Sequence, residues 1–421
     1  GLFFLFLLVV GSIYGCSDGS DSRYPDCTAT DPDNPGHRLV VVGHSDPSGY
    51  HDANVFPESQ RWVYPAYIAE RLGATYVEPE LQIGMAANGF TTPDLRSLFS
   101  ETGIKMSPYH DMFDLPSYDT KARPEERHTN LAVPGALLSQ TLRFDFASVD
   151  DCIPADFSCL FHFAVNSTPY TGLVEATGIW PSQVDIAVYL KPRWILVNIG
   201  SNDVTARVDP IAFEHHFREM LGQLTQCNAS VRVIVANVPY LAKAPGMVTA
   251  SGADQLLGFS PGTSSLAYYE ATGVIPKPED RFRLTGFSYY LLGALPTPPP
   301  LVSAAEQRVM EELTEAYNRS IQGLVEEFGM ILWDSASLTK ELFDDGIEVT
   351  IDGRQYQLTN VYGGGLWSFQ GTHVGKTVHA WSANSIIDAL NQEMQDEGAG
   401  ACLIPLVDVD VAACSDLHVR R

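Results

Sequence analysis

The sequence predicts an α/β fold in which helices connect the strands of a parallel sheet. Three observations support this prediction. Short β-branched runs alternate with segments of helical periodicity along the chain. The 421 residues are enough to bury a large core, and the hydrophobic fraction of 45% is that of a globular protein.

Six short runs that contain β-branched or other apolar residues are predicted to be strands. They cover residues 38–43, about 75–78, about 129–133, 193–199, 231–237 and 329–333.

Four helices are predicted, over 65–72, 211–225, 303–328 and about 376–394. Pro65 is well placed to open the first of them, and Gly73 to end it. The segment 303–328 carries the strongest signal: Ser303 and Glu306 form a capping box, and Gly329 ends the helix. Its predicted buried face consists of Val309, Leu313, Tyr317, Ile321, Leu324 and Phe328.

Two long insertions interrupt this pattern, at about 94–128 and about 240–300. Loops of such length in a compact domain are usually functional or disordered. The second insertion contains many aromatic residues, which favours a folded cover over a site.

The charge is strongly negative: 51 acidic against 26 basic side chains give a net charge of −25. Such a field repels phosphate backbones, so we expect no nucleic-acid partner. It also disfavours docking of the protein surface on anionic lipid, although it permits a lipid anchor.

Residues 1–15 are apolar and then small, which fits the remaining part of a truncated signal peptide. Residues 13–16, Ile-Tyr-Gly-Cys, resemble the lipobox of bacterial lipoproteins, in which Cys16 would be lipidated. The alternative is a plain cleavable signal with an incidental cysteine. Residues 16–37 are then a flexible tether. We therefore expect an exported protein of the bacterial cell envelope, held to a membrane only by its lipid, or a secreted one.

Six further cysteines suit an oxidising compartment. Cys152 with Cys159 and Cys402 with Cys414 would close short loops, which leaves Cys27 with Cys227. Six cysteines allow 15 connectivities, so this pairing stays a hypothesis. No Cys or His spacing suggests a zinc site, and we expect no metal.

Four polar or glycine positions follow predicted strands or precede the last helix. Ser45 follows the first strand, Gly135 lies in NLAVPGA, Asn202 lies in IGSND, and His373 precedes the last helix. Each has a plain structural explanation when taken alone, as a cap, a turn or a loop residue. Together they fall where open parallel sheets place their ligands, beyond the carboxyl ends of the strands.

These blocks resemble those of the SGNH (GDSL-type) hydrolase family, in its secreted bacterial lipoprotein branch. GHSDPSGY is similar to the first block, NLAVPGA to the glycine block, IGSND to the asparagine block, and GGLWSFQGTHVG to the histidine block. The resemblance implies a three-layer α/β/α sandwich with a five-stranded parallel sheet, over a domain of residues 38–398 with a C-terminal extension at 399–421.

The resemblance also implies the chemistry. Ser45 would be the nucleophile and His373 the general base, and no cofactor would be needed. The Ser45 N–H, the Gly135 N–H and the Asn202 side chain would form the oxyanion hole. A serine hydroxyl needs a base to take its proton, and the oxyanion needs preorganised donors.

The family pattern has Asp three residues before the histidine, where this chain has Gln370. Gln can orient the imidazole but cannot stabilise its charge. Three alternatives follow: a Ser–His dyad oriented by Gln370 or a backbone carbonyl, a carboxylate from elsewhere such as Asp352, or loss of hydrolysis. The first block departs as well, because His44 and Asp46 replace the usual neighbours of the serine. His44 and His51 flank the site, and Asp203 is expected to support its turn.

The sequence therefore predicts an exported esterase, lipase or acetylesterase that cleaves carboxylic esters through an acyl-enzyme. Its substrates would be lipids, short-chain acyl esters or O-acetylated glycans. The alternative is a non-catalytic surface lipoprotein that binds glycan or lipid in the same cleft. Nothing in the sequence predicts the oligomeric state.

Overall fold

The structure is a computed structural model of the chain. It describes residues 37–51, 54–55, 57–79, 83–84, 127–144, 162, 180–226, 230–284, 287, 290, 297–351, 353–360, 365–367, 373–396, 398, 403–410 and 412. The predicted signal peptide, the lipidation site Cys16 and the six cysteines of the predicted disulfides lie outside these residues, as do Gln370 and Asp352.

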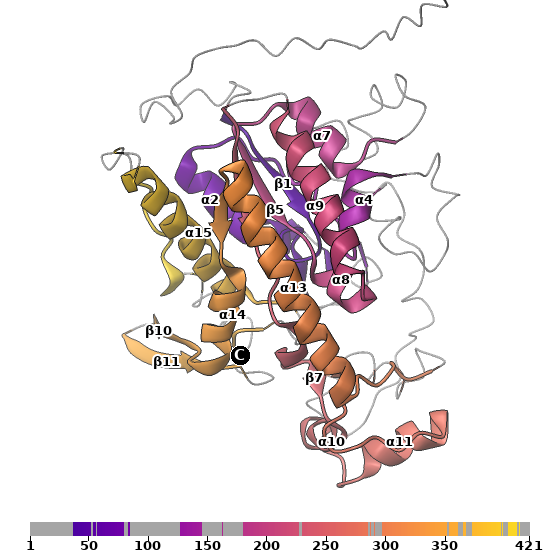
Figure 1. Cartoon of the computed structure of the whole chain (residues 1–421). Helices are drawn as coiled ribbons and strands as arrows, with labels where there is room; N and C mark the ends of the chain where they lie inside the picture. Colours follow the sequence, from indigo (N-terminus) through magenta and orange to yellow (C-terminus); the bar gives the residue numbers. More distant parts are fainter. Residues whose placement is uncertain are drawn as a thin grey trace, which may run out of the picture.

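A parallel sheet forms the centre of the molecule (Figure 1). Its four strands are β1 (Leu39–Gly43), β5 (Trp194–Asn198), β6 (Arg232–Ala236) and β9 (Ile331–Trp333), in the order β1-β5-β6-β9. All residues of β1 and β5 are buried, which explains why both strands are nearly continuous apolar runs. Runs of this kind are typical of parallel strands that are covered on both faces.

A fifth segment extends the sheet beyond β1. The Val41 N–H donates to the Thr129 carbonyl at 2.9 Å, and the Leu131 and Val133 N–H groups donate to β1 carbonyls at 2.9 and 3.0 Å. This parallel pairing places the predicted strand at 129–133 on the outer edge of β1. The segment forms a single isolated β-bridge, between Val41 and Asn130, and not a full strand. The sheet thus has four full strands and one extended edge segment in place of the five strands expected.

The predicted strand at 75–78 is reduced to one bridge, between Arg38 and Thr75. The Leu39 N–H donates to the Thr75 carbonyl at 3.1 Å. From Val41 onward the same edge of β1 is occupied by residues 129–133, and the Val77 carbonyl accepts from the Thr129 N–H at 2.9 Å instead of from β1.

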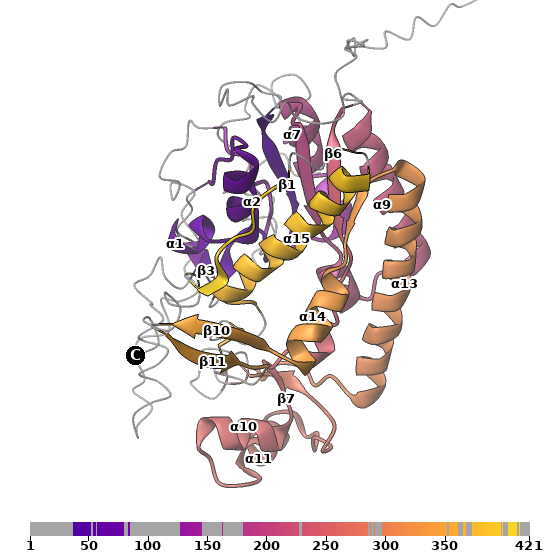
Figure 2. The ribbon, with the colours of Figure 1, turned by 90° about the vertical axis from the view of Figure 1, so that its left-hand side faces the viewer.

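Helices cover both faces of the sheet, as the three-layer prediction requires (Figure 2). Val40, Val42 and Val197 face one layer, which consists of α4 (Leu138–Leu142), α7 (Gln183–Leu190), α9 (Pro210–Thr225) and α13 (Ala304–Phe328). Leu39, Val41 and Leu196 face the other, formed by α2 (Tyr64–Leu72) and α15 (Lys376–Asp396). Alternate side chains of a strand point to opposite faces, so each strand contributes to both cores.

The helix boundaries follow the predicted signals. The Ser303 side chain accepts from the Glu306 N–H and the Glu306 side chain accepts from the Ser303 N–H, so the capping box forms, and Gly329 ends α13 in the left-handed conformation. The predicted face of this helix is wrong at one position, because Val309 is 41% exposed. The buried residues of α13 begin only at Thr314, since the first turns of the helix extend beyond the sheet.

The insertion at 240–300 is folded. It contains β7 (Met247–Val248), α10 (Ala250–Leu257), α11 (Thr263–Thr272) and β8 (Phe282–Arg283). These elements share a small core of their own around Tyr268, Phe282 and Phe287. Figure 1 shows α10 and α11 projecting from the body beside one end of α13.

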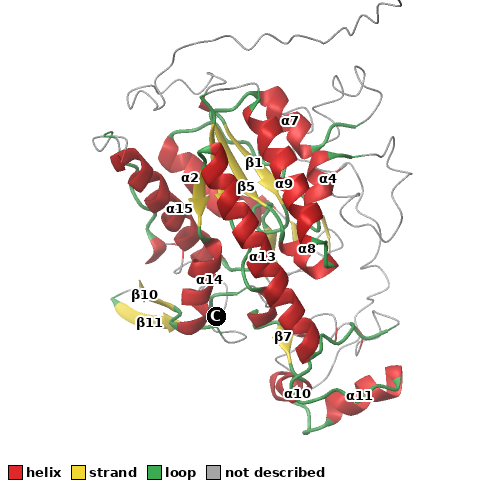
Figure 3. Ribbon diagram, in the orientation of Figure 1, coloured by secondary structure: helices red, strands yellow, loops and turns green. Residues whose placement is uncertain are grey.

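The remaining elements are short (Figure 3). They are β2 (Tyr50–His51), β3 (Asn54–Val55), α1 (Pro57–Arg61), β4 (Ile83–Gly84), α8 (Ser201–Ala206), η6 (Leu241–Lys243), α14 (Ser335–Asp344), β10 (Ile347–Ile351) and β11 (Arg354–Leu358). Among the described residues, none of the helices is both apolar enough and long enough to cross a bilayer.

Candidate active site

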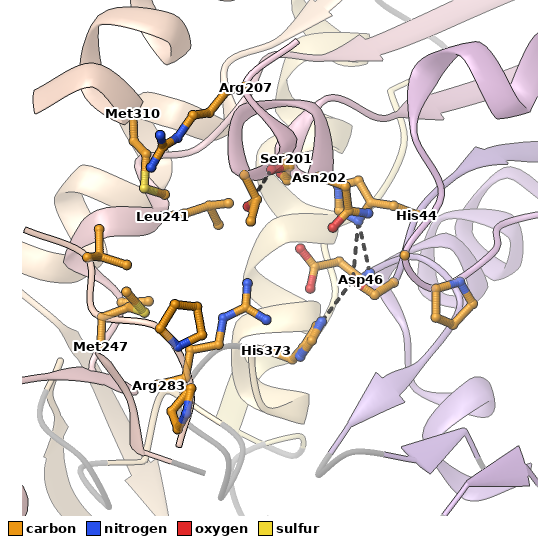
Figure 4. A pocket seen from close by; sticks show the side chains of 18 of the residues that line it. His44, Asp46, Ser201, Asn202, Arg207, Leu241, Met247, Arg283, Met310 and His373 are labelled. Carbon is orange, nitrogen blue, oxygen red and sulfur yellow. Dashed lines mark hydrogen bonds between the residues drawn. The ribbon is translucent and has the colours of Figure 1, made fainter. Parts of the chain in front are cut away.

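Ser45 and His373 are in direct contact although 328 residues separate them in the chain. The His373 Nε2 lies 2.8 Å from the Ser45 Oγ (Figure 4). Ser45 comes two residues after β1, and His373 comes three residues before α15. The structure therefore brings together the two residues that the sequence predicted as nucleophile and base.

The turn after β1 holds Ser45 in place. The Ser45 carbonyl accepts from the Ser48 hydroxyl at 2.7 Å and from the Tyr50 N–H at 3.1 Å. Gly43 precedes the turn, and a Cβ there would lie 2.5 Å from the Asn198 carbonyl oxygen of β5, so only glycine allows this approach. The backbone of the serine is thus fixed by the turn and by the neighbouring strand.

Gly135 occupies the corner of a type II turn. The Ala136 N–H donates to the Val133 carbonyl at 3.1 Å, Pro134 takes the second position, and Gly135 takes the third with a φ of 83°. This turn does not use the Gly135 N–H. Among the described residues, neither the Ser45 N–H nor the Gly135 N–H has an acceptor, and Gly135 is exposed.

Asn202 lies at the start of α8 and borders the same cavity. Its Nδ2 donates one hydrogen to the Ala136 carbonyl at 2.9 Å, which fixes the amide and leaves the second hydrogen for another acceptor. The preceding Gly200 has a φ of 118°, and a Cβ there would lie 2.7 Å from the Val238 side chain. Glycine is therefore required at the entrance to α8.

The order of the strands explains why these residues meet. With the edge segment counted, the order is 129–133, β1, β5, β6, β9, so the chain winds in opposite directions from β1. Ligands of such sheets bind outside the carboxyl ends of the strands where this direction changes. Ser45 follows β1 and Asn202 follows β5, the two strands that flank this point.

His44 is the second imidazole near Ser45. Its Nδ1 lies 3.5 Å from the Ser45 Oγ and accepts from the Asp46 N–H at 3.4 Å, which assigns the proton to Nε2. Burial lowers the pKa of His44 to about 4, so the ring is neutral at neutral pH. His373 makes the shorter contact with the serine. The side chain of His51, the other flanking histidine, lies outside the described part of the structure.

Asp203 connects two parts of the site that the sequence did not link. Its carboxylate accepts from the Leu138 N–H at 3.1 and 3.2 Å, so it ties the chain after Gly135 to the helix that carries Asn202. The side chain is 1% exposed. Burial raises the pKa of Asp203 to about 7, against the opposing effect of the Leu138 hydrogen bond. The sequence suggested only local support of a turn.

We expect Asp203→Asn to weaken the pH dependence of stability. Because the pKa of Asp203 rises from 3.8 to about 7 on folding, its contribution is fully present below about pH 4. It is lost as the pH rises to about 7, where the folded state releases its proton, and the loss is at most about 4 kcal/mol. An asparagine oxygen can still accept from Leu138. Urea unfolding at pH 4 and pH 8 should show a smaller difference for the variant than for the wild type.

Asp344→Asn, at an exposed position of α14, is the matched control and should keep the wild-type difference. An Asp203→Asn protein with the wild-type pH dependence would show that this carboxyl is ionised in the folded state well below pH 7.

The cavity beside Ser45 and His373 has a volume of about 680 Å³. Part of its wall is apolar and consists of Leu241, Met247, Leu301, Val302 and Met310. The Tyr50 ring packs edge-on against His373, with 4.9 Å between the ring centroids. Burial raises the pKa of Tyr50 to about 12 and that of Asp46 to about 7. Within the described residues, no three His, Cys, Asp or Glu side chains are grouped so as to hold a metal ion.

Comparison with known proteins bears on the family. Residues 153–358 match the model of the GDSL-like Lipase/Acylhydrolase family, a range that includes Asn202 but neither Ser45 nor His373. One similar solved structure is "Crystal Structure of TesA", with 9% sequence identity and a TM-score of 0.33, over 84% of this chain and 98% of that chain. A search of curated proteins found no match. The family match, which covers slightly less than half of the chain, supports the resemblance to the SGNH (GDSL-type) hydrolase family, whose broad activity is ester hydrolysis.

Proposed function

We propose that the protein cleaves carboxylic esters through an acyl-enzyme formed on Ser45. The observation that carries this proposal is the 2.8 Å contact between the His373 Nε2 and the Ser45 Oγ. His373 takes the hydroxyl proton as Oγ attacks the ester carbonyl, and gives it to the departing alcohol oxygen. Water then attacks the acyl-enzyme with His373 as base, releasing the carboxylic acid and free Ser45.

The oxyanion of each tetrahedral intermediate accepts from three donors: the Ser45 N–H, the Gly135 N–H and the second hydrogen of the Asn202 Nδ2. All three residues border the cavity, and none of the three hydrogens has an acceptor among the described residues. Donors that are fixed before the reaction stabilise the developing charge without having to reorganise.

The test is the turnover of p-nitrophenyl acetate and p-nitrophenyl butyrate by the chain. Release of p-nitrophenol above the rate in buffer supports the proposal. The ratio of the two rates shows which of the two acyl chain lengths is preferred. O-acetylated glycans and lipid esters are then tested in the same way as candidate natural substrates. A chain that binds such ligands without cleaving either ester would be the non-catalytic binding protein instead.

We propose that His373 works here without the aspartate usual in the family, as a dyad oriented by Gln370. Gln370→Asp restores a charge that stabilises the imidazolium, and we expect it to raise kcat about tenfold or more. The reverse change in a serine protease lowers kcat about 10⁴-fold. The measurement is kcat for p-nitrophenyl butyrate from pH 5 to pH 9. An unchanged kcat would mean that another group, for example Asp352, already supplies the charge.

Export with a lipid anchor on Cys16 is also proposed, on the sequence of residues 1–37 alone. Cys27, Cys152, Cys159, Cys227, Cys402 and Cys414 would then be free to pair in an oxidising compartment. In a bacterial host, incorporated palmitate should label the wild-type chain but not Cys16→Ser. Equal labelling of both would refute the anchor at this cysteine.

A further inference from the structure

Arg283 borders the cavity because successive side chains of β8 point to opposite faces of the strand. In this two-residue strand Phe282 is fully buried in the core of the insertion, whereas Arg283 is exposed on the opposite face. The strand is held against β7 in antiparallel register, with Met247 opposite Arg283, and the Leu284 N–H donates to the Gly246 carbonyl at 2.8 Å. The backbone of Arg283 is therefore fixed, and its side chain borders the cavity (Figure 4).

Among the described residues that line the cavity, Arg283 is the one cation without a carboxylate partner. Arg207 forms a salt bridge with Glu306, so its charge is balanced. Arg283 makes no hydrogen bond or salt bridge to any residue that the structure describes. In the described part of the chain, no salt bridge or hydrogen bond joins Arg283 to Asp46, and burial raises the pKa of that carboxyl to about 7. In a chain with a net charge of −25, an unbalanced guanidinium in this cavity is exceptional.

The guanidinium lies close to the reacting groups. Tyr50 packs on His373 with 4.9 Å between ring centroids, and Arg283 is near enough to lower the pKa of the Tyr50 phenol against the effect of burial. Arg283 is thus one aromatic side chain away from the histidine that contacts Ser45. Figure 4 shows its side chain extending toward His373 across the cavity.

We propose that Arg283 binds an anionic group, a carboxylate or a phosphate, of the ester that Ser45 attacks. The proposal rests on the proposed ester hydrolysis and narrows its substrates to anionic esters. A guanidinium donates two parallel N–H bonds to two oxygens of such a group, which a neutral ester cannot accept in this way. The apolar wall around Leu241, Met247 and Met310 takes the uncharged part of the molecule.

The experiment compares kcat/KM for anionic esters and their neutral methyl esters. p-Nitrophenyl hydrogen succinate carries the anion on the acyl side, 4-acetoxybenzoate carries a carboxylate on the alcohol side, and 4-acetoxyphenyl phosphate carries a phosphate there. The wild type should prefer at least one anionic member over its methyl ester. Arg283→Gln should lower kcat/KM for that member about 10- to 100-fold and leave the methyl ester nearly unchanged. Arg283→Lys should retain part of the preference.

Arg319→Gln is the matched control, since it removes the same charge from an exposed position of α13. An equal loss on neutral and anionic esters would overturn the proposal, because Arg283 would then act on the fold or on His373. Absence of any anionic preference in the wild type would overturn it as well. If even p-nitrophenyl acetate is not cleaved, the proposed hydrolysis fails. In that case the role of Arg283 is tested by binding alone, with calorimetric titration of p-nitrophenyl hydrogen succinate and its methyl ester into Ser45→Ala. Weaker binding of the anionic ester, but not of the methyl ester, when Arg283→Gln is added would support the role of Arg283. Equal binding would overturn it.

Discussion

Replacing Ser45 with alanine is expected to reduce ester turnover by about 10⁴- to 10⁶-fold. The Ser45 Oγ is the only hydroxyl within 2.8 Å of the His373 Nε2 among the described residues. The neighbouring imidazole of His44 does not take over as nucleophile, because its Nδ1 lone pair already accepts from the Asp46 N–H and its Nε2 carries the proton. The measurement is kcat/KM for p-nitrophenyl butyrate, beside the wild type.

The alanine variant should fold normally. Among the described residues, the Ser45 hydroxyl hydrogen-bonds only with His373 and His44, whereas the turn is held through the Ser45 carbonyl, which the substitution keeps. Ser251→Ala is the matched control: it removes a serine hydroxyl from an exposed position of α10 and leaves the turn and the nucleophile intact. Turnover by Ser45→Ala within tenfold of the wild type, with an unchanged unfolding temperature, would exclude the acyl-enzyme on this residue.

Asn202→Ala is expected to lower kcat by about 100- to 1000-fold with little effect on KM, since it removes a donor used mainly in the transition state. The substitution also removes the 2.9 Å hydrogen bond to the Ala136 carbonyl. The variant could therefore lose activity because it is less stable. The unfolding temperature of the same preparation is measured to separate this effect from a loss of catalysis.

Asn202→Asp provides the sharper comparison. It keeps the shape of the side chain but presents a negative charge to the oxyanion, so kcat should fall at least as far as for alanine. Thr205→Ala, one turn further along α8, removes a hydrogen bond to the Ser201 carbonyl without touching the proposed oxyanion hole. If Asn202→Asp retained more activity than Asn202→Ala, the amide hydrogen would not be the donor.

Much of the fold follows from local sequence. The strands β1 and β5 are apolar runs because both of their faces are buried, and α13 begins and ends where its capping box and Gly329 place it. A strand was predicted at 129–133, but the extent of regular β-structure there depends on how many hydrogen bonds the segment forms with β1. That pairing is a tertiary property, and so is the exposure of Val309.

The candidate site was predictable where its residues follow strands. Ser45, Gly135, Asn202 and His373 all border one cavity, as their positions in the sequence suggested. Two contributors were not foreseen. The bond from Asp203 to Leu138 joins segments 65 residues apart, and Arg283 lies on a strand of two residues whose facing is set by its pairing with β7. Neither leaves a periodic signal in the sequence.

The distance of 328 residues between Ser45 and His373 has a consequence for how activity arises in the cell. The serine is made near the start of the chain, whereas the histidine is made just before α15, the helix that packs with α2 against the far face of the sheet. Domains made on the ribosome are completed from the N-terminus onward. Under the proposed mechanism, a growing chain therefore carries the serine without its base, and it stays inert toward esters until its last helix has docked.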